Sequence, residues 1–255
     1  MRTTPTSPPV KGTNGSPHLQ VDGTRGKLVQ LGLGHAAEAL AEELSEAVKQ
    51  NWPGHQVLDR LLRRELAAGD ERRIKTSLRL SNLPAGLTLG NFDFGFQPSI
   101  ERRQMETLAT CAFVREHVTL LVQGPPGVGK THLVVALGVK AIEQGFSVAF
   151  YRLEELLHEM RKEAGVSPQA LRRKQYFNVA YLVVDEVGME PRTREDAGLF
   201  FRLVSYRYRR GSTAITTNKS VKDWPGILAG DEAMTAALLD RLLHKSVVLN
   251  IRGRS

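Results

Sequence analysis

The segment 124–131 most constrains what this chain can fold into, because its sequence, GPPGVGKT, matches the pattern G-x-x-x-x-G-K-[S/T]. This pattern has meaning only between a buried strand and a helix. The apolar run 118–123 precedes it, and an apolar stretch of helical length, 131–143, follows. Glycines at 124, 127 and 129 leave room for main-chain amides to wrap a triphosphate and permit positive φ angles. We therefore predict a phosphate-binding loop within an α/β fold.

The residue types of this loop assign roles to its side chains. Lys130 is expected to reach the β- and γ-phosphates, and the Thr131 hydroxyl to ligate Mg²⁺. The amides and dipole of the following helix favour the anion. The residues expected to contact the nucleotide are Gly124, Pro125, Pro126, Gly127, Val128, Gly129, Lys130, Thr131 and His132.

Further apolar runs predict the rest of a sheet. They lie at 146–151, 179–185, 212–217 and 246–251, and helix-length segments separate most of them. Alternating strands and helices indicate a parallel sheet covered on both faces. With the run at 118–123, the sequence predicts a five-stranded α/β domain over 99–255.

The run 179–185 ends in an adjacent acidic pair, Asp185 and Glu186. The carboxyl end of a parallel strand is where ligands bind in such sheets. Asp185 is placed to hold Mg²⁺ through water, and Glu186 to polarise an attacking water. The pair alone could be no more than a polar strand end, but together with the loop it indicates hydrolysis as well as binding.

The first third of the chain has a different texture. Residues 1–26 are rich in Thr, Pro, Ser and Gly and are expected to be a disordered tail. Residues 27–84 are expected to form a small helical domain, with Leu40, Leu44 and Val48 on one helix and a second helix ending near Gly69. Residues 85–98 read as a linker. Ser99 is expected to cap a helix running to Glu116.

Composition excludes several classes of protein. With Cys111 as its single cysteine, the chain can form neither an internal disulfide nor a multi-cysteine zinc site. We find no apolar stretch of the length that spans a membrane and no secretory signal, so we expect a cytoplasmic protein without a membrane partner. The net charge of +8 fits an ordinary soluble protein or one that binds a polyanion.

Four segments in order carry a family resemblance: GPPGVGKTHL, YLVVDEVG, GSTAITTNKS and LLDRLLH. Over residues 28–255 the chain resembles AAA+ ATPases of the IstB type, the helper proteins of bacterial insertion sequences, which are similar to DnaC helicase loaders. The resemblance implies ATP and Mg²⁺ as ligands. It also implies that the strand before Asn218 lies between the phosphate-loop strand and the Asp185 strand.

The resemblance also assigns roles that the residues alone leave open. Asn218, otherwise a common turn residue, becomes the group that positions water, and Arg241, otherwise a partner of Asp240 or a solvated side chain, becomes an arginine finger acting on a neighbouring subunit. Phe92 or Phe94 would border the adenine or simply pack in the core. Beyond the segment that corresponds to RGRS (252–255), family members have further residues, including an arginine often assigned as a second sensor. Arg252 and Arg254 do not match it well enough to take that role.

Family members bind duplex DNA with little sequence preference inside a ring or helical homo-oligomer, and they act with a transposase. The expected contacts are to the DNA backbone. The segment 151–175 reads as a helical insertion, two helices joined at 165–168, and the candidate contacts are Arg161, Lys162, Arg172, Arg173, Lys174, Arg207, Arg209 and Arg210, with Arg72, Arg73, Lys75 and Arg79 as a further cluster. A replicative helicase loader is the alternative of the same fold. A nucleotide-gated DNA-binding module without turnover is the alternative of another class.

Overall fold

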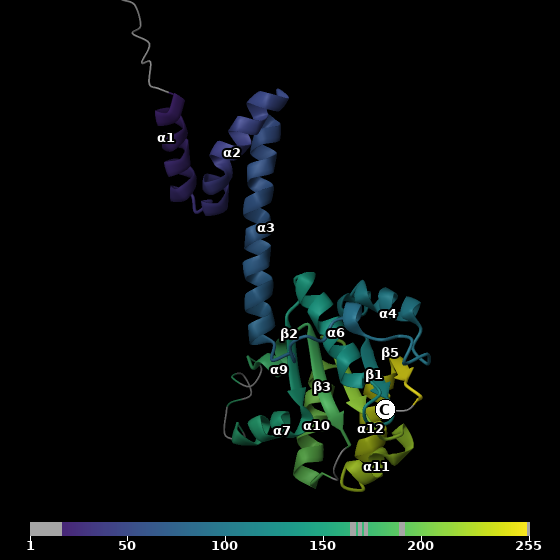
Figure 1. Ribbon diagram of the computed structural model, residues 1–255. Helices are drawn as coiled ribbons and strands as arrows, with labels where there is room; N and C mark the ends of the chain where they lie inside the picture. Colours follow the sequence, from purple (N-terminus) through teal and green to yellow (C-terminus); the bar gives the residue numbers. More distant parts are fainter. Residues whose placement is uncertain (1–16, 164–166, 168–169, 171–172, 189–191, 254–255) are drawn as a thin grey trace, which may run out of the picture. The chain divides into compact units, whose positions relative to one another are not determined.

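The computed structural model (Figure 1) describes residues 17–163, 167, 170, 173–188 and 192–253. They belong to two compact units, one ending at Arg73 and the other beginning at Ile74. The boundary falls inside one helix, α3 (Gly54–Leu80), so that helix contributes to both units. The helical domain expected to end at residue 84 therefore ends, as a compact unit, eleven residues earlier by chain position.

The first unit is a small helical cluster made by α1 (Pro17–Gln30), α2 (Gly34–Gln50) and the beginning of α3. Its core consists of small and aliphatic side chains at helical spacing: Ala36, Ala39, Leu40, Ala47, Val57 and Leu61. Glu43 is buried beside this core and accepts hydrogen bonds from Arg60 at 2.6 Å and Arg64 at 2.8 Å. The hydrogen bond from Arg60 is the main cause that holds the pKa of Glu43 below its ordinary value.

Three details of this unit differ from the expectation. The helix α1 begins at Pro17, inside the segment expected to be a disordered tail, because Val21 and Leu28 lie seven residues apart and both pack on the core. Residues 1–16 lie outside the described residues. Helix α3 continues through Gly69, whose cost of about 1 kcal/mol is small in a stretch of strong helix formers. Val48 does not face the core, since it is 84% exposed.

The second unit is built on a parallel sheet, as predicted. Within the described residues the sheet has five strands in the order β2 (Val148–Arg152), β3 (Tyr181–Val187), β4 (Ser212–Thr217), β1 (Thr119–Gln123) and β5 (Ser246–Asn250). All four pairings are parallel. Strand β4 lies between β1 and β3, which is the arrangement that the resemblance implied. The carboxyl ends of β1, β3 and β4 therefore meet at one edge of the sheet.

Alternate strand residues bury themselves on opposite faces. One face, with Leu120 and Val183, is covered by α4 (Arg102–Ala109), α5 (Ala112–Arg115) and α6 (Lys130–Glu143). The other face, with Leu121 and Val184, is covered by α7 (Leu153–Lys162), α9 (Gln175–Asn178), α10 (Arg194–Arg207), α11 (Trp224–Ile227) and α12 (Glu232–Leu243). The short 3₁₀ helices are η1 (Leu89–Asn91) and η2 (Val221–Asp223). The domain thus has the helix–sheet–helix layering that alternation predicted (Figure 1).

The helix expected from Ser99 to Glu116 is two helices instead. Helix α4 begins at Arg102, and Cys111, with φ of 55°, separates it from α5. The Ser99 side chain does not cap a helix: its hydroxyl donates to the carbonyl of Arg252 at 2.9 Å and accepts from the Arg252 amide at 3.1 Å. Ser99 thereby ties the segment before α4 to the segment after β5.

The expected insertion is described in part. Helix α7 lies within it and the short α9 begins at its last residue, Gln175, while 164–166, 168–169 and 171–172 are outside the described residues. Every helix in the described ranges is too short or too polar to cross a bilayer.

Candidate functional site

The predicted phosphate-binding loop joins the end of β1 to the start of α6. Two of its glycines are required by the geometry. A Cβ at Gly124 would lie 2.5 Å from the carbonyl oxygen of Ile251, and one at Gly129, where φ is +91°, would lie 2.8 Å from the ring of Phe92. Real Cβ atoms do not tolerate such contacts, so glycine lets the loop hold this shape against Ile251, which follows β5, and against Phe92.

The Phe92 ring packs against the phosphate-binding loop at Gly129. This ring is 8% exposed, belongs to the core cluster, and packs edge-on against Phe94 at 4.9 Å and His132 at 5.1 Å between centroids. The imidazole Nε2 of His132 lies 2.8 Å from the Thr88 carbonyl oxygen. The expected linker 85–98 is therefore packed on the start of α6. This supports the packing role for Phe92, and an adenine contact for Phe92 or Phe94 stays a prediction.

Lys130 lies over the loop. Its ammonium donates to the carbonyl oxygens of Gly124 at 2.9 Å and Pro125 at 2.7 Å. Burial lowers the pKa of Lys130, while Asp185 and Glu186 partly offset that effect. A cation that is partly desolvated and close to the loop amides is suited to a triphosphate.

Thr131 and Asp185 meet although 54 residues separate them. The Thr131 hydroxyl lies 3.0 Å from both carboxylate oxygens of Asp185, which is 3% exposed at the end of β3. A hydroxyl and a carboxylate are hard oxygen donors of the kind Mg²⁺ prefers, and Mg²⁺ at phosphate sites needs only one or two protein ligands. The described residues contain no cluster of three or more His, Cys, Asp or Glu side chains that could hold a metal. The donor set therefore fits Mg²⁺ bound together with a phosphate.

Glu186 has an unusual backbone conformation beside a residue that the sequence analysis did not identify. Its φ is +61°, and the β3–β4 pairing shifts between Val184 and Val187. The Glu186 amide donates to the Thr216 hydroxyl at 3.0 Å, and that hydroxyl donates to Asp185. The Glu186 carboxylate is half exposed, with the Arg152 Nε at 3.6 Å. In the sequence, Thr216 could have been noticed as a hydroxyl residue two positions before Asn218, within a run predicted to be a buried strand.

Asn218 follows β4 directly and opens onto the loop. A groove of about 520 Å³ lies at this edge of the sheet. Its lining consists of Gly124 and Pro125 of the loop, Asn218, Lys219 and Ser220 after β4, and Gln123, Asn250, Ile251 and Arg252. The structure thus brings together the predicted Lys130, Thr131, Asp185, Glu186 and Asn218 at one edge of the sheet.

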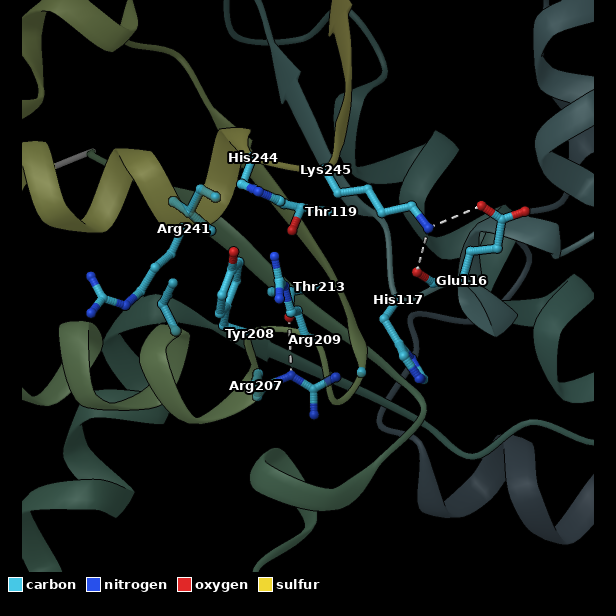
Figure 2. Close-up of a pocket in the computed structure, with 13 residues that line it drawn as sticks. Glu116, His117, Thr119, Arg207, Tyr208, Arg209, Thr213, Arg241, His244 and Lys245 are labelled. Atoms are coloured by element: carbon cyan, nitrogen blue, oxygen red, sulfur yellow. Dashed lines mark hydrogen bonds and ion pairs between the residues drawn. The ribbon is translucent and has the colours of Figure 1, made fainter.

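Arg241 lies at the opposite edge of the sheet and is one of the cavity-lining residues drawn in Figure 2. It lines a cavity of about 270 Å³ with residues at the beginnings of β1 and β4, among them Thr119 and Thr213. Its guanidinium stacks on the Phe201 ring at 4.9 Å and donates to the Ala237 carbonyl at 2.7 Å. Five strand residues at about 3.3 Å each separate this edge from the loop by roughly 16 Å. Arg241 therefore does not face the loop of its own chain.

Arg207 lines the same cavity, and its surroundings contradict its expected contact with DNA. Arg207 is 2% exposed and donates to four main-chain carbonyls and a hydroxyl, those of Tyr176, Phe177, Val179, Ser212 and Thr213, at 2.7–3.3 Å. Burial lowers its pKa to about 10, which leaves it charged at neutral pH. A buried, saturated guanidinium has no surface to offer to DNA, so the prediction for Arg207 is wrong.

The remaining basic candidates differ in how free they are. Arg161 pairs with Asp196 at 2.5 Å, and Lys174 pairs with Glu163. The exposed candidates in the second unit are Lys162, Arg173, Arg209 and Arg210, with Lys75 and Arg79 on α3. In the first unit, Arg72 lies 3.5 Å from Glu65 and Arg73 lies 3.3 Å from Asp70. Arg172 and Arg254 lie outside the described residues.

Known proteins resemble this chain along almost its whole length. The profile of the family described as IstB-like ATP binding protein matches residues 26–255. An insertion sequence IS21 putative ATP-binding protein of Pseudomonas aeruginosa is 39% identical over 228 residues, which are 89% of this chain and 86% of that protein. An insertion sequence IS5376 putative ATP-binding protein of Geobacillus stearothermophilus is 34% identical over 200 residues, 78% and 79% of the two chains.

Solved structures resemble the fold. The crystal structure of the DnaC helicase loader superposes with a TM-score of 0.50 at 24% identity and covers 59% of this chain and 87% of its own. With the five-stranded sheet and its flanking helices, this similarity confirms the predicted AAA+ fold.

Proposed function

The chain belongs to the family of IstB-like ATP-binding proteins, and from this premise we propose that it hydrolyses ATP with Mg²⁺ while assembled on duplex DNA, as a helper of transposition. One observation carries the proposal: the phosphate-binding residues and Arg241 lie at opposite edges of the sheet. A nucleotide held at one edge of a subunit can meet Arg241 only from another subunit. Hydrolysis would then depend on assembly.

Each residue at the loop edge has a part in the proposed reaction. Lys130 and the loop amides bind the phosphates of ATP, and Thr131 and Asp185 would hold Mg²⁺, which would supply positive charge beside the phosphates. Glu186 accepts the proton of the attacking water or polarises it, because its carboxylate is half exposed next to this site. Asn218 orients that water from the end of β4.

Arg241 would complete the site in trans. Its guanidinium is held by the Phe201 ring and the Ala237 carbonyl, so it is presented in a restrained conformation. An arginine finger stabilises charge that develops on the transferred phosphoryl group. With Arg241 supplied by a neighbour, ATP binds two subunits together and its hydrolysis releases them.

Contact with DNA is proposed for the exposed cations of the second unit. Lys162 and Arg173 lie in the insertion, and Arg209 and Arg210 lie in the turn before β4. Contacts of this kind are made to phosphates and carry no base readout. Anisotropy of a labelled duplex is expected to show an affinity that falls steeply with salt, by a log–log slope of about 0.9 per phosphate contacted. A flat salt dependence would refute these contacts.

The partner that best fits the family is a transposase. The relatives in Pseudomonas and Geobacillus are named for insertion sequences and share 39% and 34% identity with this chain. The helicase loader, by contrast, shares the fold at 24% identity. We therefore propose a helper of transposition over a replicative loader.

Subunit mixing tests the central proposal. Lys130→Ala removes a phosphate ligand in its own site, and Arg241→Ala removes the group offered to the next site, so each variant alone is expected to lack hydrolysis. In an equal mixture about one quarter of the junctions combine an intact loop with an intact Arg241, and about one quarter of the wild-type rate should return.

The control pairs two defects of the same site. Lys130→Ala mixed with Glu186→Gln leaves every junction with a damaged loop-edge site, so activity should stay absent at all ratios. Absence of rescue in the Lys130→Ala and Arg241→Ala mixture at every ratio would refute action in trans. Equal rescue in the control mixture would refute the assignment of Glu186.

A further inference from the structure

Strand β3 contains a bulge at its acidic pair, and a single residue of β4 lies opposite that bulge. Val184 pairs with Ile215 and Val187 pairs with Thr217, so Asp185 and Glu186 together oppose Thr216 alone. Two residues opposing one is the definition of a β-bulge, a feature that re-aims side chains near functional sites. The positive φ of Glu186, +61°, belongs to this bulge.

The Thr216 hydroxyl binds both members of the acidic pair. It accepts a hydrogen bond from the Glu186 amide at 3.0 Å and donates to a carboxylate oxygen of Asp185. A hydroxyl has one proton, so donating to Asp185 and accepting from Glu186 defines its orientation. Thr216 is 1% exposed and Asp185 3% exposed, so water does not substitute easily for either bond.

We propose that Thr216 is a positioning residue. It fixes the Asp185 carboxylate for Mg²⁺ binding, and it fixes the backbone of Glu186, whose carboxylate acts on the attacking water. This inference rests on the proposed function of the site. Asp185 has two hydroxyl neighbours, Thr131 and Thr216. Once Thr131 turns to the metal, Thr216 remains to fix the carboxylate. Loss of its hydroxyl would therefore impair both metal binding and hydrolysis while leaving the phosphate loop intact.

Thr216→Val removes the hydroxyl and keeps the shape of the side chain. Binding of a fluorescent ATP analogue is titrated with Mg²⁺ on the full chain. Thr216→Val is expected to raise the Mg²⁺ concentration at half-effect by about 10–100-fold, the range seen when outer-shell partners of metal ligands are removed, and to leave metal-free binding unchanged. The value of kcat should fall by a similar factor, with KM for ATP at saturating Mg²⁺ little altered.

Two comparisons separate positioning from packing. Thr216→Ser and Thr216→Ala lose the same methyl group and differ from each other only by the hydroxyl, so Ser should stay within about threefold of wild type and Ala should behave like Val. Tyr181→Phe is the matched control, because it removes another fully buried hydroxyl. Tyr181 lies on the neighbouring strand β3, and its hydroxyl donates to the Val134 carbonyl of α6 at 3.2 Å. It should leave the Mg²⁺ titration unchanged.

The outcomes distinguish this proposal from the proposed function. If the wild type binds the analogue with Mg²⁺ but never hydrolyses ATP, the proposed hydrolysis fails, and the Mg²⁺ titration still decides the role of Thr216. If Val and Ala keep the wild-type Mg²⁺ dependence, the proposal for Thr216 is overturned. Equal losses in Ser and Ala would overturn it as well, since the methyl group and not the hydroxyl would then matter. Should Val not fold, the Ser and Ala pair gives the decision.

Discussion

Replacing Arg207 by Met tests whether this cation supports the fold or contacts DNA. The guanidinium donates to five acceptors from α9, the segment before β3, and the start of β4, and it is 2% exposed. No carboxylate is among those five partners, so its charge is stabilised by carbonyl dipoles. Met preserves much of the side-chain volume but none of these hydrogen bonds.

The expected magnitude follows from those contacts. Leaving a buried acceptor without its donor costs roughly 1–3 kcal/mol, and four carbonyls and one hydroxyl lose theirs. Removing the guanidinium also removes its desolvation penalty, which offsets several kcal/mol. We expect a net loss of about 3–5 kcal/mol in the free energy of unfolding, because the cost of five unpaired buried acceptors exceeds the desolvation penalty that is relieved. For a domain of this size that lowers Tm by roughly 6–20 °C.

Thermal and denaturant unfolding measure this loss, and a DNA titration measures the alternative. Arg210→Met is the matched control, because Arg210 lies three positions away and its side chain is exposed over the Tyr206 ring at 4.7 Å. It should keep the wild-type Tm within about 2 °C and reduce the salt slope of DNA binding by about 1. Arg207→Met should lower Tm and leave the salt slope of DNA binding unchanged. A wild-type Tm together with a reduced salt slope in Arg207→Met would refute the structural role.

Three further predictions concern single residues. Gly129→Ala should weaken ATP binding by roughly tenfold or more, because its Cβ would meet Phe92 at 2.8 Å where φ is +91°, whereas Gly198→Ala, in open space on α10, should bind normally; equal affinities in an equilibrium titration would contradict this. Cys111 is fully buried and burial raises its pKa, so at pH 7 it should react with a maleimide at least roughly 100-fold more slowly than in the urea-unfolded chain, and fast labelling would count against the fold around α5. Glu43, whose pKa Arg60 holds below the ordinary 4.5, should stabilise the first unit above pH 4.5 and lose that contribution as pH falls through its lowered pKa; Glu43→Gln should flatten this acid limb of the stability curve, and an unchanged limb would show that Glu43 is not responsible.

Sequence patterns predicted those parts of the site that are contiguous or strongly periodic. The phosphate-binding loop could be recognised because a triphosphate demands glycines and a lysine at fixed spacing between a strand and a helix. Asp185 and Glu186 could be placed because a buried strand ends at them. Their meeting with Thr131 was an expectation, and the structure brings Thr131 to 3.0 Å from Asp185.

Other predictions failed where the signal of one residue competed with its neighbours in sequence or with packing. Gly69 suggested a helix end, yet neighbouring helix formers carry α3 through it. Ser99 suggested a helix cap, yet its hydroxyl binds the main chain of Arg252, 153 residues away. Propensity is a weak signal at such positions, because a contact with a distant segment changes the energy by as much as the propensity itself.

The sequence by itself determined the α/β class, the loop that binds phosphate and the acidic strand end, since each depends on residues that are neighbours along the chain. Only the tertiary structure decided that Arg207 is buried, that Thr216 holds Asp185 and Glu186 in a bulge, and that Arg241 lies at the far edge of the sheet. These three depend on strand order and register, which bring residues about 30 positions apart into contact or send a helix end to the opposite edge. One-dimensional spacing contains no such information.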